Sequence, residues 1–401
     1  RLGREGSYFI GRGVNPLNSL HQGYLMAGGG MVSISSSVSG INSMEIDEGQ
    51  NEAYLIEKIS ASSHTKLHKF HLDVGTIAGS PFWPHSISNT AHAGHSTVKG
   101  EDVKLYPIAS SVYLFYSWND NTDGDVGRVL ATGALTFDDD FMTREPSGAS
   151  STAFSKLYPH PMLEWGENGF LYIANGRSLH QFDGQTGANG TFTANKFQLP
   201  IFWIITSLFD AGEFIGITAL HYPIYLANDP FVWSSYSQGE RAVFFWDGVS
   251  ASFNKKVPVE DINIRASKSI NGNYYIFGEN QNNEGVIKKW NGQTFELVSK
   301  ILTNITSTSS NITRYPYSYG SISKYNNGIL IPASNGNEIM YFGKIKPELP
   351  EALYNISTLT NVASSDTQCF SLASYSKNII VSSRKLSKNT FYLNRISKTN
   401  N

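Results

Sequence analysis

One short phrase returns three times in this sequence: an apolar run, then an aromatic residue, Asp or Asn, Gly, one further residue and Ser or Thr. The copies span residues 179–186, 243–250 and 287–294, and their turns are Phe182-Asp183-Gly184, Trp246-Asp247-Gly248 and Trp290-Asn291-Gly292. An apolar strand that leads into Asp-Gly or Asn-Gly is the strongest short-range signal of a β-hairpin. Because the phrase recurs at distances typical of structural repeats, the sequence predicts an array of similar units.

A second phrase precedes these turns and consists of three or four apolar or aromatic residues followed by small ones. Its seven copies begin at Tyr24, Tyr113, Phe170, Phe214, Tyr274, Ile329 and Ile379. Propeller blades are about 40–50 residues long and have four strands. The sequence therefore predicts an all-β, seven-bladed β-propeller with four-stranded antiparallel blades, formed as one domain by residues 1–401. A pair of β-sandwiches is the alternative, but sandwiches do not require a phrase to return.

Three features of the predicted ring concern its gaps and its ends. Long loops are expected at about 77–106 and 220–238, the first because 89 residues separate the copies at Tyr24 and Tyr113. Residues 54–59 are expected to form a strand of the first blade. Residues 7–11 and 391–396 are also strand-like, and one of these segments would complete the blade begun by the other, which removes two free sheet edges.

The composition limits the classes of partner. The net charge is −2, from 31 basic and 33 acidic residues, so attraction to nucleic acid is not indicated. No apolar run approaches the roughly 20 residues of a membrane span. Cys369 is the single cysteine, which excludes an intrachain disulfide; it is expected as a small buried residue of an inner strand. The scarcity of charge is typical of extracellular and virion β-proteins, and a start at Arg1 is compatible with export and cleavage.

The densest polar segment resembles the first half of a calcium loop. Asn119, Asn121, Asp123 and Asp125 alternate with other residues, and Gly124 stands where such loops turn sharply. The twelfth position is Leu130 instead of Glu. The segment is thus either a Ca²⁺ site, the one cofactor considered, or a solvated hairpin turn rich in Asx residues.

Other polar groups do not form a catalytic motif. His92 and His95 share a loop, but metal sites need three or four ligands with supporting partners. The carboxylates of residues 138–140 follow a strand in alternating directions, so they do not form the opposed pair that glycoside hydrolysis requires. No nucleophile elbow or phosphate loop occurs. The chain is therefore predicted to be non-enzymatic.

Two further sets of residues are candidates for surface chemistry. The 220–238 segment is rich in aromatic residues, which either bind a sugar or protein partner or pack the loop onto its own blade; these are Tyr222, Tyr225, Trp233 and Tyr236. Four sequons offer acceptors for N-glycosylation if the source modifies asparagine; they begin at Asn189, Asn304, Asn311 and Asn355.

Several segments resemble propeller-type structural proteins of tailed bacteriophages. They include residues 170–177 with 182–184, residues 243–253, residues 84–103 and residues 116–127. The resemblance covers roughly residues 80–300 and carries no catalytic residue. It implies a virion or tail-associated protein that binds a host glycan, a receptor or neighbouring subunits within a larger assembly.

Two other functions stay open. The first is a secreted or cell-surface adhesin or a component of an extracellular filament, which the sequons favour. The second is a carbohydrate-active enzyme, because propellers support many chemistries. Opposed carboxylates at the centre of the ring would favour the enzyme, whereas a centre of Ser, Thr and apolar residues would favour a binding protein.

Overall fold

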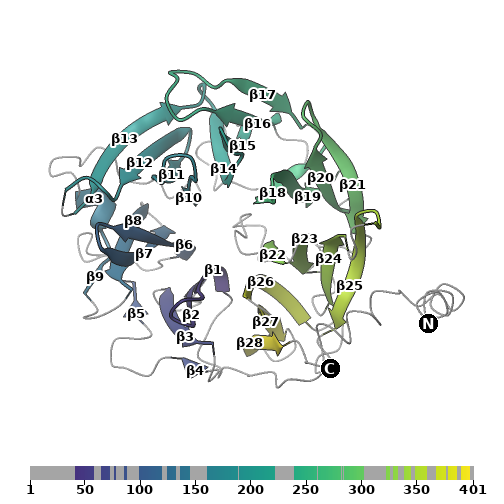
Figure 1. Cartoon of the computed structure of the whole chain (residues 1–401), viewed down its shortest axis with the longest axis horizontal. Helices are drawn as coiled ribbons and strands as arrows, with labels where there is room; N and C mark the ends of the chain where they lie inside the picture. Colours follow the sequence, from purple (N-terminus) through teal and green to yellow (C-terminus); the bar gives the residue numbers. More distant parts are fainter. Residues whose placement is uncertain are drawn as a thin grey trace, which may run out of the picture.

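The computed structural model describes residues 41–57, 65–72, 76–77, 85–87, 99–119, 124–131, 136–144, 160–187, 189–221, 239–259, 261–280, 282, 284–301, 322–325, 328–332, 338–344, 348–358, 367–375, 378–385 and 390–397. These residues form seven antiparallel sheets arranged in a ring (Figure 1). In six sheets each strand pairs with the next one along the chain, from the centre of the ring outwards; in the first sheet β4 and β5 both pair with β3.

The first four sheets follow one another along the chain. The first sheet contains β1 (Ile41–Asp47), β2 (Glu52–Glu57), β3 (Lys66–His71), β4 (Thr76–Ile77) and β5 (His85–Ser86). The second contains β6 (Lys99–Ile108), β7 (Ser111–Asn119), β8 (Gly124–Leu130) and β9 (Phe137–Asp138), followed by the short helix α3 (Phe141–Arg144). The third contains β10 (Met162–Glu164), β11 (Leu171–Asn175), β12 (Ser178–Asp183) and β13 (Thr191–Gln198). The fourth contains β14 (Trp203–Asp210), β15 (Ile215–His221), β16 (Arg241–Trp246) and β17 (Lys255–Pro258).

The remaining three sheets complete the ring. The fifth contains β18 (Asn263–Ile270), β19 (Asn273–Glu279), β20 (Gly285–Trp290) and β21 (Phe295–Ile301). The sixth contains β22 (Ser323–Tyr325), β23 (Gly328–Pro332), β24 (Glu338–Gly343) and β25 (Ala352–Thr358). The last contains β26 (Thr367–Tyr375), β27 (Asn378–Lys385) and β28 (Thr390–Ser397).

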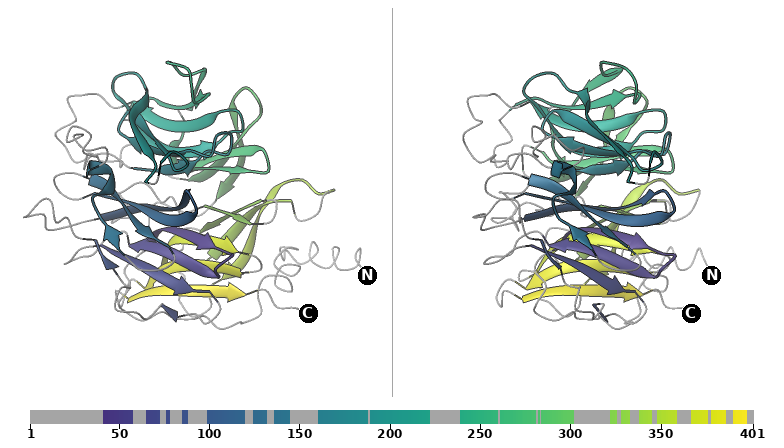
Figure 2. Two further views of the ribbon diagram at one scale, coloured as in Figure 1. Left: turned by 60° about the vertical axis from the view of Figure 1, so that its left-hand side comes forward. Right: turned by 90° about the vertical axis from the view of Figure 1, so that its left-hand side faces the viewer.

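The architecture is thus an all-β propeller with four-stranded antiparallel blades, as predicted. The prediction of seven four-stranded blades is wrong for the described residues. Six sheets have four or more strands, whereas β26–β28 form a sheet of three. The innermost strand of each sheet contacts that of the next, and β26 contacts β1, so the last sheet lies beside the first (Figure 2).

The apolar phrase marks the second strand of a sheet, with one error in its first copy. The copies from Tyr113 onward lie on or directly before β7, β11, β15, β19, β23 and β27. In the first sheet the second strand is β2, which carries Tyr54 as expected, while Tyr24 lies outside the described residues. The gap that predicted a loop over 77–106 therefore came from a wrong starting point, and that range includes β5 and most of β6. Cys369 lies on the inner strand β26, as expected.

The aromatic–Asp/Asn–Gly phrase follows a strand and opens a hairpin, as predicted. It joins the third strand of a sheet to the fourth, and its loops are longer than the tight turns expected. β16 ends at Trp246 and β17 begins at Lys255. The carboxylate of Asp247 accepts hydrogen bonds from the backbone N–H groups of Val249 and Ser250 at 3.0 and 2.8 Å. The Ser250 hydroxyl also donates to it, which is the main reason that the pKa of Asp247 lies below its ordinary range. The side chain thus stabilises an Asx turn that opens a wider loop.

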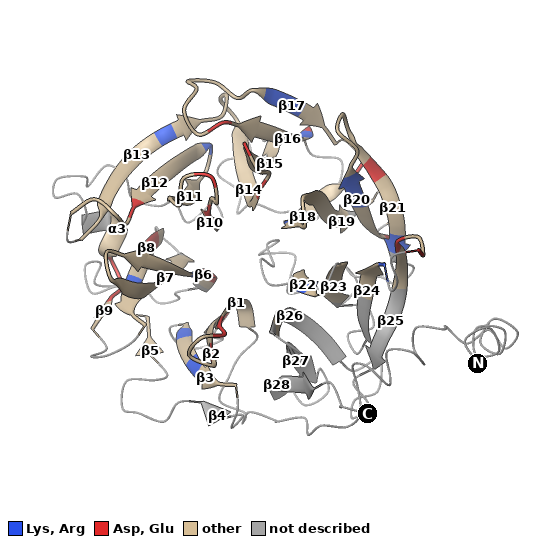
Figure 3. Cartoon of the chain, viewed as in Figure 1, with Lys and Arg blue, Asp and Glu red and all other residues tan. Residues whose placement is uncertain are grey.

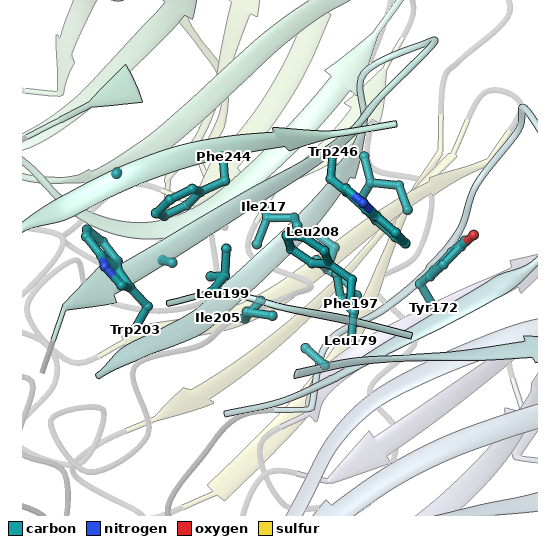
Figure 4. Packing of buried hydrophobic residues seen from close by; sticks show 14 of the residues in the cluster. Tyr172, Leu179, Phe197, Leu199, Trp203, Ile205, Leu208, Ile217, Phe244 and Trp246 are labelled. Carbon is teal, nitrogen blue, oxygen red and sulfur yellow. The ribbon is translucent and has the colours of Figure 1, made fainter. Parts of the chain in front are cut away.

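Apolar side chains from facing sheets form the core between blades. Figure 4 shows the cluster between the third and fourth sheets, where Tyr172 and Phe197 face Trp246 and Phe244 packs on Trp203. The Phe197 and Trp246 rings are stacked with centroids 4.6 Å apart. Burial of aromatic and β-branched side chains between sheets is the main source of stability available to such a ring.

In two sheets, an aromatic residue near the end of the inner strand contacts the next sheet of the ring. The Tyr106 hydroxyl of the second sheet donates to the Gly169 carbonyl of the third at 2.7 Å, and a Cβ on Gly184 would collide with Tyr106 and Pro107. In the next pair, the Trp165 indole N–H donates to the Gly212 carbonyl at 2.9 Å, and a Cβ on Gly248 would collide with Trp165. In two of the three repeated phrases the glycine, Gly184 or Gly248, is therefore needed for close approach of the preceding sheet, whereas a Cβ on Gly292 would meet no atom within 4 Å.

Candidate functional site at the centre of the ring

Ionisable side chains from several inner strands meet near the centre of the ring. Lys104 on β6 donates to the Glu45 carboxylate on β1 at 2.9 Å, and both side chains are half-buried. The negative charge of Glu45 raises the pKa of Lys104 above its ordinary value. The pKa of Glu164 on β10 is raised, mainly by burial; the positive charge of Lys104 lowers it and the negative charge of Glu45 raises it. Residues of both signs occur on the strands around the centre (Figure 3).

Lys268 extends this cluster from β18, on the other side of the ring (Figure 1). Its pKa is lowered, first by removal from water and then by the positive charge of Lys104, whereas Glu45 acts in the opposite direction. Lys324 on β22 also lowers it. β18 is the innermost strand of its sheet (Figure 1), so Lys268 stands beside the centre, and these influences show that its charge interacts with those of Lys104 and Glu45. We call Glu45, Lys104, Glu164, Lys268 and Lys324 the central ionic cluster.

Asp102 lies beside this cluster and connects three successive sheets. Its carboxylate accepts a hydrogen bond from the Ser43 hydroxyl on β1 at 2.7 Å and another from the backbone N–H of Met162 on β10 at 3.0 Å. The side chain is buried, and burial raises its pKa to about 6 despite these hydrogen bonds. The carboxylate therefore has a structural task already, because its acceptor sites face groups of the two neighbouring sheets.

Serine hydroxyls make further links between inner strands. Ser207 on β14 and Ser267 on β18 are joined at 2.6 Å, and the backbone N–H of Ser374 on β26 donates to the Ser323 hydroxyl on β22 at 3.1 Å. The described residues at the centre therefore match neither expectation in full. They include hydroxyl groups that link neighbouring inner strands, together with the central ionic cluster.

A buried histidine in the third sheet makes the fold sensitive to acid. The Nδ1 atom of His180 accepts a hydrogen bond from the backbone N–H of Asn195 at 3.1 Å, and the ring stacks on Phe192. Burial, followed by the charge of His160, lowers the pKa of His180 from 6.5 to about 4. Protonation is therefore easier in the unfolded chain, and the folded state loses stability as the pH falls from about 6.5 towards 4.

We expect the variant His180→Asn to lose less stability than the parent over this range, by about 3 kcal/mol. Asparagine keeps an acceptor for the Asn195 N–H but does not titrate. Urea unfolding of both proteins at pH 7 and pH 4 measures this difference. Asp102 acts in the opposite direction below pH 6 but is present in both proteins, so its effect cancels. Equal pH dependence of the two proteins would contradict the assignment.

The structure covers the sequence-predicted sites only in part. Of the calcium candidate, Asn121 and Asp123 lie outside the described residues, Asn119 ends β7, and Asp125 is buried on β8 with its carboxylate against the Val126 N–H. Among the described residues no group of three or more His, Cys, Asp or Glu side chains is placed to hold a metal ion.

The predicted binding loop and most sequons also fall beyond the described part. Tyr222, Tyr225, Trp233 and Tyr236 lie outside it, as do Asn304 and Asn311. Asn189 is exposed in the turn between β12 and β13, and Asn355 lies on β25 opposite Met340. The described carboxylates of the Asp138–Asp140 run support structure: the Tyr116 hydroxyl donates to Asp139 at 2.6 Å.

Sequence reasoning missed the central ionic cluster. Its members stand on five inner strands between residues 45 and 324, and no local motif joins them. The one signal available was the position of each of these strands as the first of its blade. First strands line the centre of a propeller, so their polar residues could have been expected to lie near one another. Among the described helical residues, none form a helix with the length and apolar character needed to cross a membrane.

Comparisons with known proteins identify the fold alone. No family model and no curated protein matches the sequence. Among solved structures, the chain is similar to Raptor of Chaetomium thermophilum, with a TM-score of 0.54 and 10% identity over 96% of this chain and 30% of Raptor. It is also similar to the Dos1 propeller, with a TM-score of 0.51 and 10% identity over 92% of this chain and 97% of that one. The chain thus spans under a third of Raptor but nearly the whole Dos1 propeller, and what it shares with both is a β-propeller fold.

Proposed function

We propose that the chain is a non-enzymatic binding scaffold, a virion structural or attachment protein whose loops bind a host glycan or a neighbouring subunit. The observation that supports this is the use of the central acids. The Glu45 carboxylate pairs with Lys104, and the Asp102 carboxylate holds Ser43 and Met162 of the neighbouring sheets. Catalytic acids must be free to exchange protons or attack a substrate. Acids that hold blades together favour a rigid scaffold.

Two alternatives retain specific support. A secreted or cell-surface adhesin is favoured by the exposed position of Asn189, which suits a glycosylated surface. A carbohydrate-active enzyme is favoured by Glu164, because a raised pKa is what a general acid needs. Glu164 would also need an opposed carboxylate as its partner, and the candidate is Glu45, whose negative charge contributes to the raised pKa of Glu164.

A paired assay separates binding from catalysis. The intact protein is screened on an array of glycans, and each glycan that binds is then tested for hydrolysis with the parent, Glu164→Gln and Glu167→Gln. Glu167 is exposed in the turn after β10 and serves as the matched control. We expect binding by all three proteins and no hydrolysis product. Product released by the parent and by Glu167→Gln, but not by Glu164→Gln, would contradict the proposal.

We also propose that the three-stranded sheet is a seventh blade, and that residues 7–11, which lie outside the described part of the chain, supply its outer strand. β26 contacts both β22 and β1, so this sheet occupies the place of a blade between the sixth sheet and the first. Among the described strands β28 pairs only with β27, which leaves its outer edge open. Pairing there would protect an open sheet edge.

A further inference from the structure

We propose that the centre of the ring binds the oxyanion group of a ligand, a carboxylate or a phosphate, through Lys268 and Lys324. The two lysines stand on neighbouring inner strands, β18 and β22, which contact each other. This inference is independent of the proposed function, since a structural protein and an enzyme could equally hold an anion there.

The pairing of charges within the central ionic cluster leaves these two lysines available. Lys104 donates to Glu45 at 2.9 Å, so its charge is compensated. Within the part of the chain that the structure describes, neither the Lys268 nor the Lys324 ammonium group has a hydrogen bond or ion pair. Several other described lysines of the ring have acidic partners, for example Lys289 with Glu351 at 2.9 Å.

The position of Lys268 makes its lack of a partner costly. The side chain is half-buried, and removal from water lowers its pKa, as does the nearby charge of Lys104. A cation that loses water without gaining a counter-ion destabilises the folded state. An anion bound between Lys268 and Lys324 would supply that counter-ion and would be held by charge-assisted hydrogen bonds.

Neighbouring groups define what kind of anion would fit. The acids whose charges act on Lys268 are Glu45, already paired with Lys104, and Asp102, held by Ser43 and Met162. The hydroxyls of Ser267 and Ser323 bond to Ser207 and Ser374 of other sheets, and adjacent residues of a strand point to opposite faces, so these hydroxyls are not part of the site. Two ammonium groups on neighbouring strands suit a compact group that has several acceptor oxygens.

Thermal unfolding in matched salts tests this site. The parent, Lys268→Met, Lys324→Met and the control Lys196→Met are melted in sodium chloride, sodium phosphate and sodium citrate at equal ionic strength. Lys196 is exposed on β13, away from the centre. We expect phosphate or citrate to raise the midpoint of the parent and of Lys196→Met by about 3 °C or more, as ligand linkage predicts.

The two central variants should respond differently. Lys268→Met should lose the rise completely and should melt at a higher temperature than the parent in chloride, because methionine removes a desolvated cation. Lys324→Met should lose part of the rise. An equal rise in the parent and in Lys268→Met, or no rise of the parent in either anion, would overturn the proposal.

Discussion

Replacement of Trp165 with alanine is expected to lower the free energy of unfolding by about 3–5 kcal/mol, the usual range for a large buried aromatic residue. The side chain is 2% exposed, packs on Gly248 of the following sheet and donates its indole N–H to the Gly212 carbonyl. Its loss would open a cavity between two blades and leave a carbonyl without its donor. Chemical denaturation followed by far-UV circular dichroism measures the change.

A graded control separates packing from the hydrogen bond. Trp165→Phe keeps most of the ring but not the donor, so it should cost less than the alanine variant, by the part due to the cavity. In the same way Tyr106→Phe should lose about 1 kcal/mol, because its hydroxyl bonds to Gly169. If Trp165→Ala costs less than about 1 kcal/mol, the contact between these sheets does not hold the ring together.

Removal of residues 1–20 is expected to destabilise the protein by about 3–6 kcal/mol, the value for two or three apolar side chains that lose their burial. The reason is the proposed seventh blade: without residues 7–11 the outer edge of β28 would have no partner strand. Removal of residues 1–6 alone should have a small effect. The free energy of unfolding of the two truncated proteins, compared with the full chain, measures this.

The two truncations also decide whether the last blade is closed. A large loss that is confined to the removal of residues 1–20 would assign the closing strand to residues 7–11. No loss from either truncation would show that the three-stranded sheet is stable with an open edge, which would leave six complete blades as the final architecture.

The sequence predicts the class of fold well because each strand carries its own local signal. The apolar phrases identify the second strands, and the Asp-Gly and Asn-Gly phrases identify the third-to-fourth connections. It predicts loop length poorly, because the Asp247 carboxylate binds backbone N–H groups and opens a longer turn. The role of Gly248 was also hidden, since Trp165, which packs against it, comes from the preceding sheet.

The candidate site could not be predicted because it exists only after the ring closes. Glu45 and Lys104 are 59 positions apart, yet their charged groups lie 2.9 Å from each other. Lys268 joins them from a sheet on the other side of the ring. The pattern within each strand indicates which residues share a face of the sheet. Only the order of the sheets around the ring determines which charged residues of different strands lie close together.

Imaging of native source particles, with the chain located by a specific antibody, tests the central claim most directly. The binding-scaffold account predicts that the chain occupies fixed, repeated positions on the outside of an ordered assembly. A chain found only as a free monomer, in fractions that hydrolyse a glycan, would contradict this account and favour the carbohydrate-active enzyme.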